Sequence, residues 1–157
     1  MEFWTLIEKI RDLILDSQEV EDWCLAYYGQ KNKVYIGYDE NDPPPQSDYP
    51  LVVIAPAEQS RSIEVDYGDM MIPVGYGLYD KTKTTLDNVV TFEGVKNLLG
   101  FRKVVEDQLF GVDVDYGGAW IESADEFLEP VEMFPFFISI VDYRFRNPDR
   151  FNPILPT

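Results

Sequence analysis

The sequence predicts an α/β chain of the α+β kind, with a single twisted, mostly antiparallel sheet packed by helices. Three observations predict this fold. The stretches 3–14 and 91–109 repeat apolar residues at steps of three and four, as amphipathic helices do. Other stretches alternate apolar and polar residues, which is typical of strands. Proline-rich stretches at 43–50 and 147–156 cannot join a sheet and predict a loop and an extended arm.

The chain length of 157 residues predicts one domain over 1–157, with 146–157 as an extended, proline-rich C-terminal arm. A chain of this length buries about 70 % of its unfolded surface, so it needs no disulfide to fold. Cys24 is the only cysteine, which excludes an intramolecular disulfide. Because it lies in a helical pattern, Cys24 is predicted to be a small core residue.

The first forty residues predict two helices followed by a strand. An apolar stripe runs from Phe3 to Ile14 at helical spacing. Asp16 or Ser17 can cap a second helix, and Gly29 can end it. The stretch KVYIGYD then alternates apolar residues and predicts a strand.

A proline-rich loop and a short apolar run follow. Pro43, Pro44 and Pro45 lie in ENDPPPQSDYP, where they favour an extended polyproline form. The next residues, LVVIAP, predict a central strand that is buried on both faces and ends at Pro56. We therefore expect a stiff, exposed loop that leads directly into the sheet.

A long hairpin is predicted over 63–78. Apolar residues occupy odd positions up to Tyr67 and even positions from Met70, so the phase changes at Gly68-Asp69. Such a change is typical of a turn or a bulge, and this dipeptide favours a turn. The polar stretch DKTKTTLDN that follows is predicted to be a mobile loop.

The second half predicts a helix, a turn within strand-like residues and a last strand. Thr91 is a plausible cap for the helix over 91–109, and Gly111 can end it. The predicted apolar face of this helix consists of Phe92, Val95, Leu98, Leu99, Arg102, Val105 and Leu109. The stretch FPFFISIVDYRF predicts the last strand, and the prolines of NPDRFNPILPT exclude regular structure beyond it.

The chain is strongly negative, because it contains 29 Asp and Glu but only 13 Lys and Arg, which gives a formal net charge of -16. Such a surface repels nucleic acid phosphates and anionic membranes and predicts no specific nucleic-acid binding. Ten acids and no Lys or Arg lie between Val104 and Tyr143. This region predicts either a solvated acidic surface or one acidic face that docks a partner or lines a channel. The candidates for that face are Asp113, Asp115, Glu122, Asp125 and Glu126.

No catalytic signature occurs in the sequence. The absence of His excludes Ser-His-Asp and Cys-His machinery, and a single Cys without His excludes an ordinary zinc site. No phosphate loop or dinucleotide fingerprint is present. Glycosidases use two carboxylates that lie close together. Because the chain has 29 acids, some carboxylates must lie this close by chance, so such a pair is no evidence for catalysis. We therefore expect no enzyme activity, no cofactor and no metal.

The N-terminal stretch MEFWTLIEKIRDLIL contains acids and lacks a basic region, which predicts no signal peptide. No apolar run approaches the roughly 20 residues of a membrane span. These observations predict a soluble chain that is made in the cytoplasm and does not enter a membrane.

The order of predicted elements resembles that of the tail terminator and tail-completion (head-tail joining) proteins of long-tailed bacteriophages. DYPLVVIAP is similar to their strand after a proline-bearing loop, and FFISIVDYRFR is similar to their closing strand. The resemblance covers 1–146. It implies an α/β fold without catalytic residues, which forms a hexameric ring that caps the tail tube, ends tube polymerisation and meets the head. The implied partners are further copies of the chain, the tail tube protein and a head-completion protein, and the implied location is the head-proximal end of the virion tail.

A closed ring needs heterologous interfaces, in which two different surfaces of the chain meet. Extended proline-rich segments lose little entropy on ordering, so both such segments are candidates for these interfaces. The candidate interface residues are Pro43, Pro44, Pro45, Tyr49, Phe151 and Ile154. In a ring, the acidic face would line a bore through which DNA passes without sticking. The alternative hypothesis is an acidic binding inhibitor, either an immunity protein or a DNA mimic, that acts on a basic partner.

Overall fold

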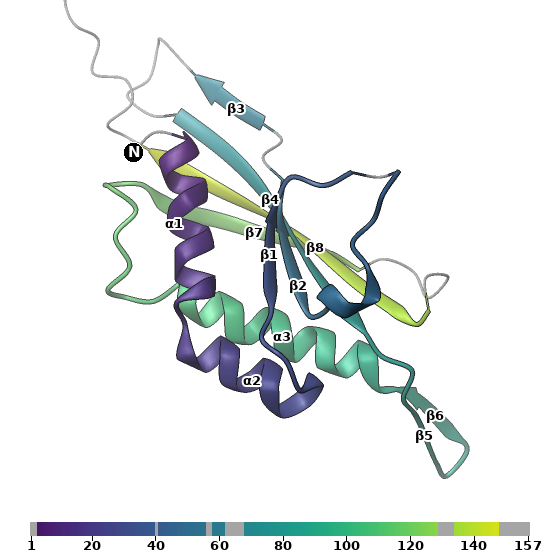
Figure 1. Ribbon diagram of the computed structural model, residues 1–157. Helices are drawn as coiled ribbons and strands as arrows, with labels where there is room; N and C mark the ends of the chain where they lie inside the picture. The colour runs from purple at the N-terminus through teal and green to yellow at the C-terminus, as the bar shows by residue number, and fades with distance from the viewer. Residues whose placement is uncertain (1–2, 40, 56–57, 62–67, 129–133, 148–157) are drawn as a thin grey trace, which may run out of the picture.

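The structure is a computed structural model that describes residues 3–39, 41–55, 58–61, 68–128 and 134–147. Within these residues it contains three α-helices, one mixed sheet of six strands and a separate two-stranded sheet (Figure 1). The predicted α+β class with a mostly antiparallel sheet is therefore confirmed. No helix in these ranges is long and apolar enough to cross a membrane.

Three helices cover the sheet, and local capping fixes both ends of the second. They are α1 (Phe3–Leu15), α2 (Gln18–Tyr28) and α3 (Glu93–Leu109). Ser17 caps α2 by accepting a hydrogen bond from the amide of Val20 at 3.2 Å, and Gly29 ends it with a φ of 72° that favours glycine. The stripe of α1 is buried as predicted, at Leu6, Ile7, Ile10 and Ile14.

The main sheet has the strand order β1-β2-β4-β8-β7, with β3 pairing to β4. Its strands are β1 (Lys33–Ile36), β2 (Leu51–Ile54), β3 (Glu58–Arg61), β4 (Gly68–Tyr79), β7 (Trp120–Leu128) and β8 (Phe136–Asn147). Only the β1–β2 pairing among these is parallel. The predicted central strand is confirmed, since β2 lies between β1 and β4.

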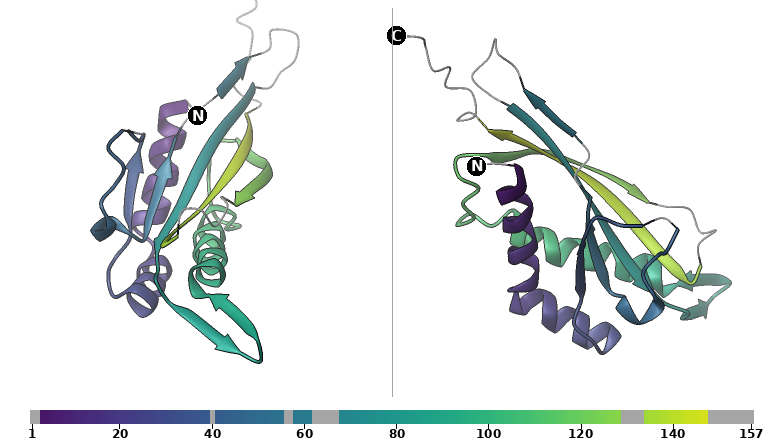
Figure 2. Two further views of the ribbon diagram at one scale, coloured as in Figure 1. Left: turned by 90° about the vertical axis from the view of Figure 1, so that its right-hand side faces the viewer. Right: turned by 45° about the horizontal axis from the view of Figure 1, so that its top comes forward.

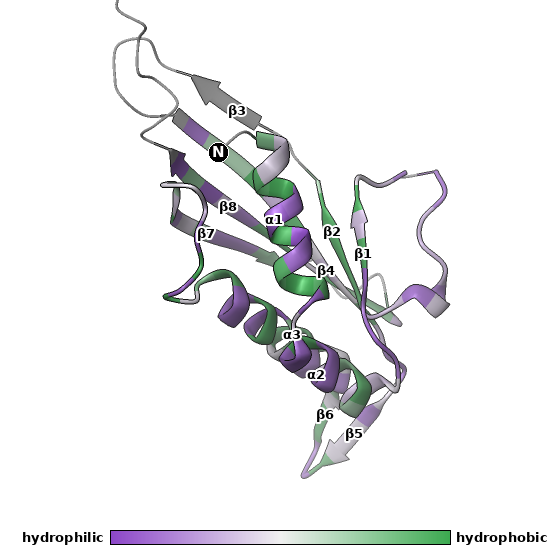
Figure 3. Ribbon diagram, turned by 60° about the vertical axis from the view of Figure 1, so that its left-hand side comes forward, coloured by the Kyte–Doolittle hydropathy of each residue, from purple (hydrophilic) through white to green (hydrophobic). Residues whose placement is uncertain are grey.

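The two faces of the sheet differ. Alternate residues of β4, from Met70 to Leu78, are buried in one apolar core with residues of all three helices. The opposite face carries Gly75 and Gly77 on β4, next to half-buried Ile138 and Ile140 on β8. Figure 3 shows that hydropathy also differs between strands, since β2 is hydrophobic and much of β7 is hydrophilic.

Two predictions are wrong, one of a turn and one of a loop. Gly68 and Asp69 are not a hairpin turn, because they lie inside β4 and pair with Arg61 and Ser60 of β3. The odd-numbered apolar residues predicted for 63–67 lie outside the described residues. The polar stretch after Tyr79 is not a mobile loop, since it forms most of a second, two-stranded hairpin.

This second hairpin consists of β5 (Lys83–Leu86) and β6 (Val89–Phe92). Asp87 and Asn88 connect the strands with φ values of 50° and 64°, which is the conformation of a two-residue type I′ turn. The amide of Glu93 donates to the carbonyl of Thr82 at 3.1 Å and fixes the base of the hairpin. The hairpin projects from the body of the molecule in every view (Figures 1 and 2).

The start and the phase of α3 differ from the prediction. Thr91 does not cap α3, because it belongs to β6, and Phe92 at the N-cap makes no side-chain capping bond. Phe101, which the predicted face omits, is fully buried, whereas the predicted face residues Val95 and Leu99 are exposed. The predicted arm overlaps β8 at Arg146 and Asn147, and its remaining residues, 148–157, lie outside the described residues.

Candidate functional site

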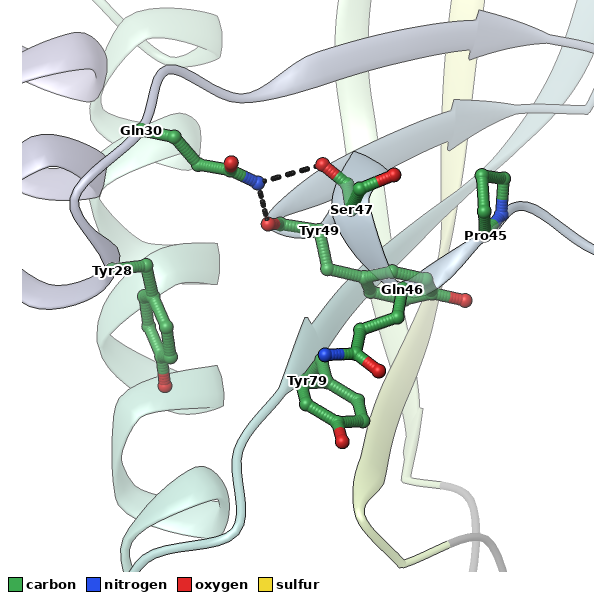
Figure 4. Close-up of a pocket in the computed structure, with 7 residues that line it drawn as sticks. All are labelled: Tyr28, Gln30, Pro45, Gln46, Ser47, Tyr49 and Tyr79. Carbon is green, nitrogen blue, oxygen red and sulfur yellow. Dashed lines mark hydrogen bonds between the residues drawn. The ribbon is translucent and has the colours of Figure 1, made fainter.

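The loop between β1 and β2 is held against the body of the protein by side chains from two other elements. Gln30, just after α2, donates from Nε2 to the carbonyl oxygens of Ser47, at 2.9 Å, and Tyr49 (Figure 4). A short 3₁₀ turn, η1 (Gln46–Asp48), brings both carbonyls toward Gln30. The proline-rich loop is therefore an ordered wall next to the sheet.

Asp48 is a second anchor of this loop. Its carboxylate is almost fully buried and accepts hydrogen bonds from Lys33 Nζ, at 2.6 Å, and from the hydroxyl of Tyr35. The hydrogen bond from Lys33 is the main cause that lowers the pKa of Asp48, and the bond from Tyr35 adds to it. The same contact raises the pKa of Tyr35. Both donors lie on β1, so Asp48 fastens the end of the loop to the edge of the sheet.

Replacing Asp48 with asparagine is expected to loosen the loop and to lower the thermal midpoint at pH 7. The folded-state pKa of Asp48 is depressed, so its stabilisation is present above the unfolded value of about 3.9 and is lost as pH falls through the folded value. The difference in midpoint between D48N and the parent chain should therefore be smaller at pH 3 than at pH 7. Calorimetry at the two pH values measures this, and an equal difference at both would contradict the anchor.

The loop borders an apolar hollow on the sheet face opposite the helices, which we call the tyrosine–proline groove. Its floor is β4 at Gly75 and Gly77, neither of which carries a side chain. Its walls are apolar side chains of β2 and β8, namely Leu51, Val53, Ile138 and Ile140. The hollow has a volume of about 410 Å³, within the range of roughly 300–1,000 Å³ that is usual for ligand pockets.

The rim of the groove contains three of the predicted interface residues. Pro43, Pro44 and Tyr49 line it together with Tyr38, whose side chain was not a candidate. The ring of Tyr49 lies directly over β4, because a Cβ at Gly77 would approach its Cε1 to 2.8 Å. Phe151 and Ile154 lie outside the described residues. The groove could not be found from the sequence, since it depends on which strands flank the two glycines.

Pro45 lies on the other side of Tyr49, in a second pocket of about 500 Å³ (Figure 4). Tyr28 and Tyr79 line this pocket with the residues of η1. The hydroxyl of Tyr28 donates to Asp80 at 2.8 Å, and burial, followed by this bond, raises the pKa of Tyr28. The phenol therefore stays protonated at neutral pH and acts as a hydrogen-bond donor.

A second apolar surface lies on the projecting hairpin and the adjoining part of α3, which we call the hairpin surface. Leu86 and Val89 pair across the hairpin on one face and are 74 % and 61 % exposed, whereas Val90, 55 % exposed, lies on the other face. Val95 and Leu99 of α3 continue the surface and line a shallow hollow with Val90. Because these exposed apolar side chains gather on one projecting hairpin and the neighbouring helix, the hairpin surface is a candidate site of interaction.

The five acidic candidates do not share one face. Asp113 and Asp115 are exposed in the loop between α3 and β7. Asp125 pairs in register with Asp142, whereas Glu126 pairs with the buried Val141, so the two point to opposite faces of β7. Glu122 lies at an irregularity of β7 and forms an ion pair with Arg146.

Glu126 belongs instead to a polar network between α3 and the sheet. Arg102 forms ion pairs with Glu106, at 2.8 Å, and with Glu126. Glu106 also accepts from the hydroxyl of Tyr143 at 2.8 Å, and that hydroxyl lies 2.7 Å from the hydroxyl of Tyr76. Burial is the main cause that raises the pKa of both tyrosines. The network therefore connects α3 to the sheet.

The described part of the chain contains no group of three or more His, Cys, Asp or Glu that could hold a metal ion. The thiol of Cys24 is buried, and this burial raises its pKa to about 12, so it is not a reactive nucleophile at neutral pH. The fold and these surfaces define an α+β protein with exposed apolar surfaces. No protein-family model matches the chain, and no match was found among curated proteins.

Proposed function

We propose that this chain is a structural protein of a phage or prophage tail, which forms a ring that caps the tail tube. The ring ends tube polymerisation and provides the joint to the head. In this role the chain catalyses no reaction and needs no cofactor. Its partners are other copies of itself, in the ring of six that the family resemblance implies, together with the tail tube protein and a head-completion protein.

The observation that carries the proposal is a pair of exposed apolar surfaces on a chain of net charge -16. The hairpin surface lies beside α3, and the tyrosine–proline groove lies on the sheet face opposite the helices. A heterologous interface joins two different surfaces of successive copies, and such interfaces close into a ring when the rotation between copies permits it. The remaining acidic surface keeps the unassembled chain soluble.

The order of elements also supports the proposal. Two helices, a strand, a proline-bearing loop, a central strand, a hairpin, a helix and closing strands follow one another, and β5–β6 is inserted before α3. This is the order on which the resemblance to tail terminator proteins rests. Exposed acids such as Asp113, Asp115 and Asp125 would repel DNA phosphates if they faced a bore.

Light scattering after size exclusion, together with negative-stain images of the chain alone and with tail tubes, tests the proposal. We expect a ring of six copies, either free or at the tube end. Replacing Val89 and Val90 with lysine should abolish the ring and leave a folded monomer, because both side chains are more than half exposed. The matched control is Val112→Lys, at a fully exposed valine in the loop after α3.

A chain that stays monomeric at every concentration and never associates with tubes would overturn the proposal. Tight, salt-sensitive binding of that monomer to one basic protein would favour the acidic inhibitor instead. Equal loss of the ring in V112K and in the hairpin variant would show that added positive charge, rather than the hairpin surface, is responsible.

A further inference from the structure

The tyrosine–proline groove has the chemistry of a site for a proline-rich peptide. Grooves that bind such peptides are lined by aromatic side chains and accept a preformed polyproline helix. Tyr38 and Tyr49 supply aromatic rings at this groove, and Leu51 and Ile138 supply apolar walls. The groove is open to solvent along β4, because Gly75 presents no side chain to it.

The chain itself contains a matching peptide. Residues 153–156 read Pro-Ile-Leu-Pro, which is the PxxP spacing that aromatic-lined grooves bind. Phe151 and Arg150 precede it, and Asp149 balances the charge of Arg150. A segment without net charge can approach an acidic copy of the chain without the repulsion that the rest of the surface would meet.

The length of the segment disfavours binding of this motif in the groove of its own chain. Ile138 lies nine residues before Asn147 on β8, which is about 30 Å at a strand rise of roughly 3.3 Å per residue. Pro153 lies six residues after Asn147, so a fully extended chain carries it at most about 22 Å back. The near end of the groove, at Pro73, lies opposite Asp142, about 17 Å before Asn147, so the segment reaches the groove of its own chain only if it reverses after Asn147 and stays almost fully extended. A segment from a second copy meets no such restriction.

We infer that residues 150–156 of one copy bind the tyrosine–proline groove of a second copy. The inference rests on the proposed self-assembly and names one of its contacts. The prolines stack against the rim tyrosines, and Ile154 and Leu155 face the apolar walls. The hairpin surface is then free to meet a different part of the neighbouring copy or the tube.

Disulfide cross-linking tests the contact. A synthetic peptide of residues 147–157 that carries Ile154→Cys is mixed with the full chain that carries Ile138→Cys, and the yield is measured on a denaturing gel. Buried Cys24 remains in place, since its thiol is unreactive. We expect a cross-link with the groove variant and none with Ser123→Cys, which lies on the same sheet face outside the groove.

Filling the groove provides a second readout. A Cβ at Gly75 would meet Val53 at 3.7 Å, an ordinary contact, so Gly75→Val should fold and occupy the floor. We expect roughly tenfold less cross-linking in this background, and a similar loss when the peptide carries Pro153→Ala and Pro156→Ala. Ser123→Val is the control for added apolar bulk, and thermal midpoints establish that each variant is folded.

The full chains then identify the occupant. Chains with Ile154→Cys and chains with Ile138→Cys, each with its own tag, should give a product that carries both tags. A diluted double variant that cross-links within one chain would overturn the second copy as occupant. Failure of the peptide to cross-link while the chain still forms rings would overturn this inference and leave the proposed function standing. Cross-linking of the peptide to a chain that never assembles would overturn both the second copy and the ring.

Discussion

Replacing Phe101 with alanine is expected to lower the free energy of unfolding by about 3–5 kcal/mol. The side chain is fully buried in the middle of α3. Its ring stacks on Trp23 of α2, with centroids 5.4 Å apart, and meets Tyr76 of β4 edge-on at 5.9 Å. The substitution therefore removes a contact that joins two helices to the sheet and leaves a cavity that stiff aromatic neighbours cannot fill.

The matched control is Leu99→Ala, two residues earlier on the same helix. Leu99 is 39 % exposed, so we expect a loss below about 1 kcal/mol. Urea denaturation followed by circular dichroism measures both changes. The structure turns Phe101 toward the core and Leu99 toward solvent, whereas the sequence pattern alone places Leu99 in the core and omits Phe101. A larger loss of stability for L99A than for F101A would contradict this orientation of α3.

The helix phase shows what the sequence could and could not predict. The stripe of α1 was predicted correctly because its strongly apolar residues, such as Ile7 and Ile10, have a single helical period. Along α3, Val95 and Leu99 compete with Phe101 for the core face, and hydropathy does not distinguish them. The packing of Trp23 from α2 decides between them, and that contact joins residues far apart in the sequence.

The hairpin and the groove illustrate the same limit. Lysine and threonine made the stretch before Asp87 resemble a mobile loop, and the turn lacks the glycine that usually signals a hairpin. The glycines of β4 could be read from the sequence, but the hollow above them exists only because β2 and β8 flank that strand. Three of the predicted interface residues, Pro43, Pro44 and Tyr49, nevertheless line this groove.

The acidic candidates illustrate the two-residue period of side chains along a strand. Asp125 and Glu126 are adjacent, and side chains alternate between the faces of a strand. Once this stretch is a strand, the two residues cannot share a face. The pairing of Glu126 with Arg102 of α3 could not be predicted, because it depends on how α3 crosses the sheet.

Replacing Arg102 with methionine is expected to lower the free energy of unfolding by about 2–3 kcal/mol. Removing one partner of a buried ion pair usually costs about 3–5 kcal/mol, and solvent reduces this loss because the side chain of Arg102 is 26 % exposed. Methionine retains much of the apolar stem but leaves the carboxylates of Glu106 and Glu126 without their cation. The hydroxyls of Tyr143 and Ser139 still donate to these carboxylates but do not neutralise them.

Two variants make this prediction specific. Lys103→Met removes the next cation of α3, whose ion pair with Asp107 is 3.4 Å long and exposed, and we expect a change below about 0.5 kcal/mol. Adding Glu106→Gln and Glu126→Gln to R102M removes the unpaired charges and should recover part of the lost stability. Urea denaturation of the four chains at pH 7 measures the series. Equal losses for R102M and K103M, or no recovery in the triple variant, would mean that the network does not stabilise the contact between α3 and the sheet.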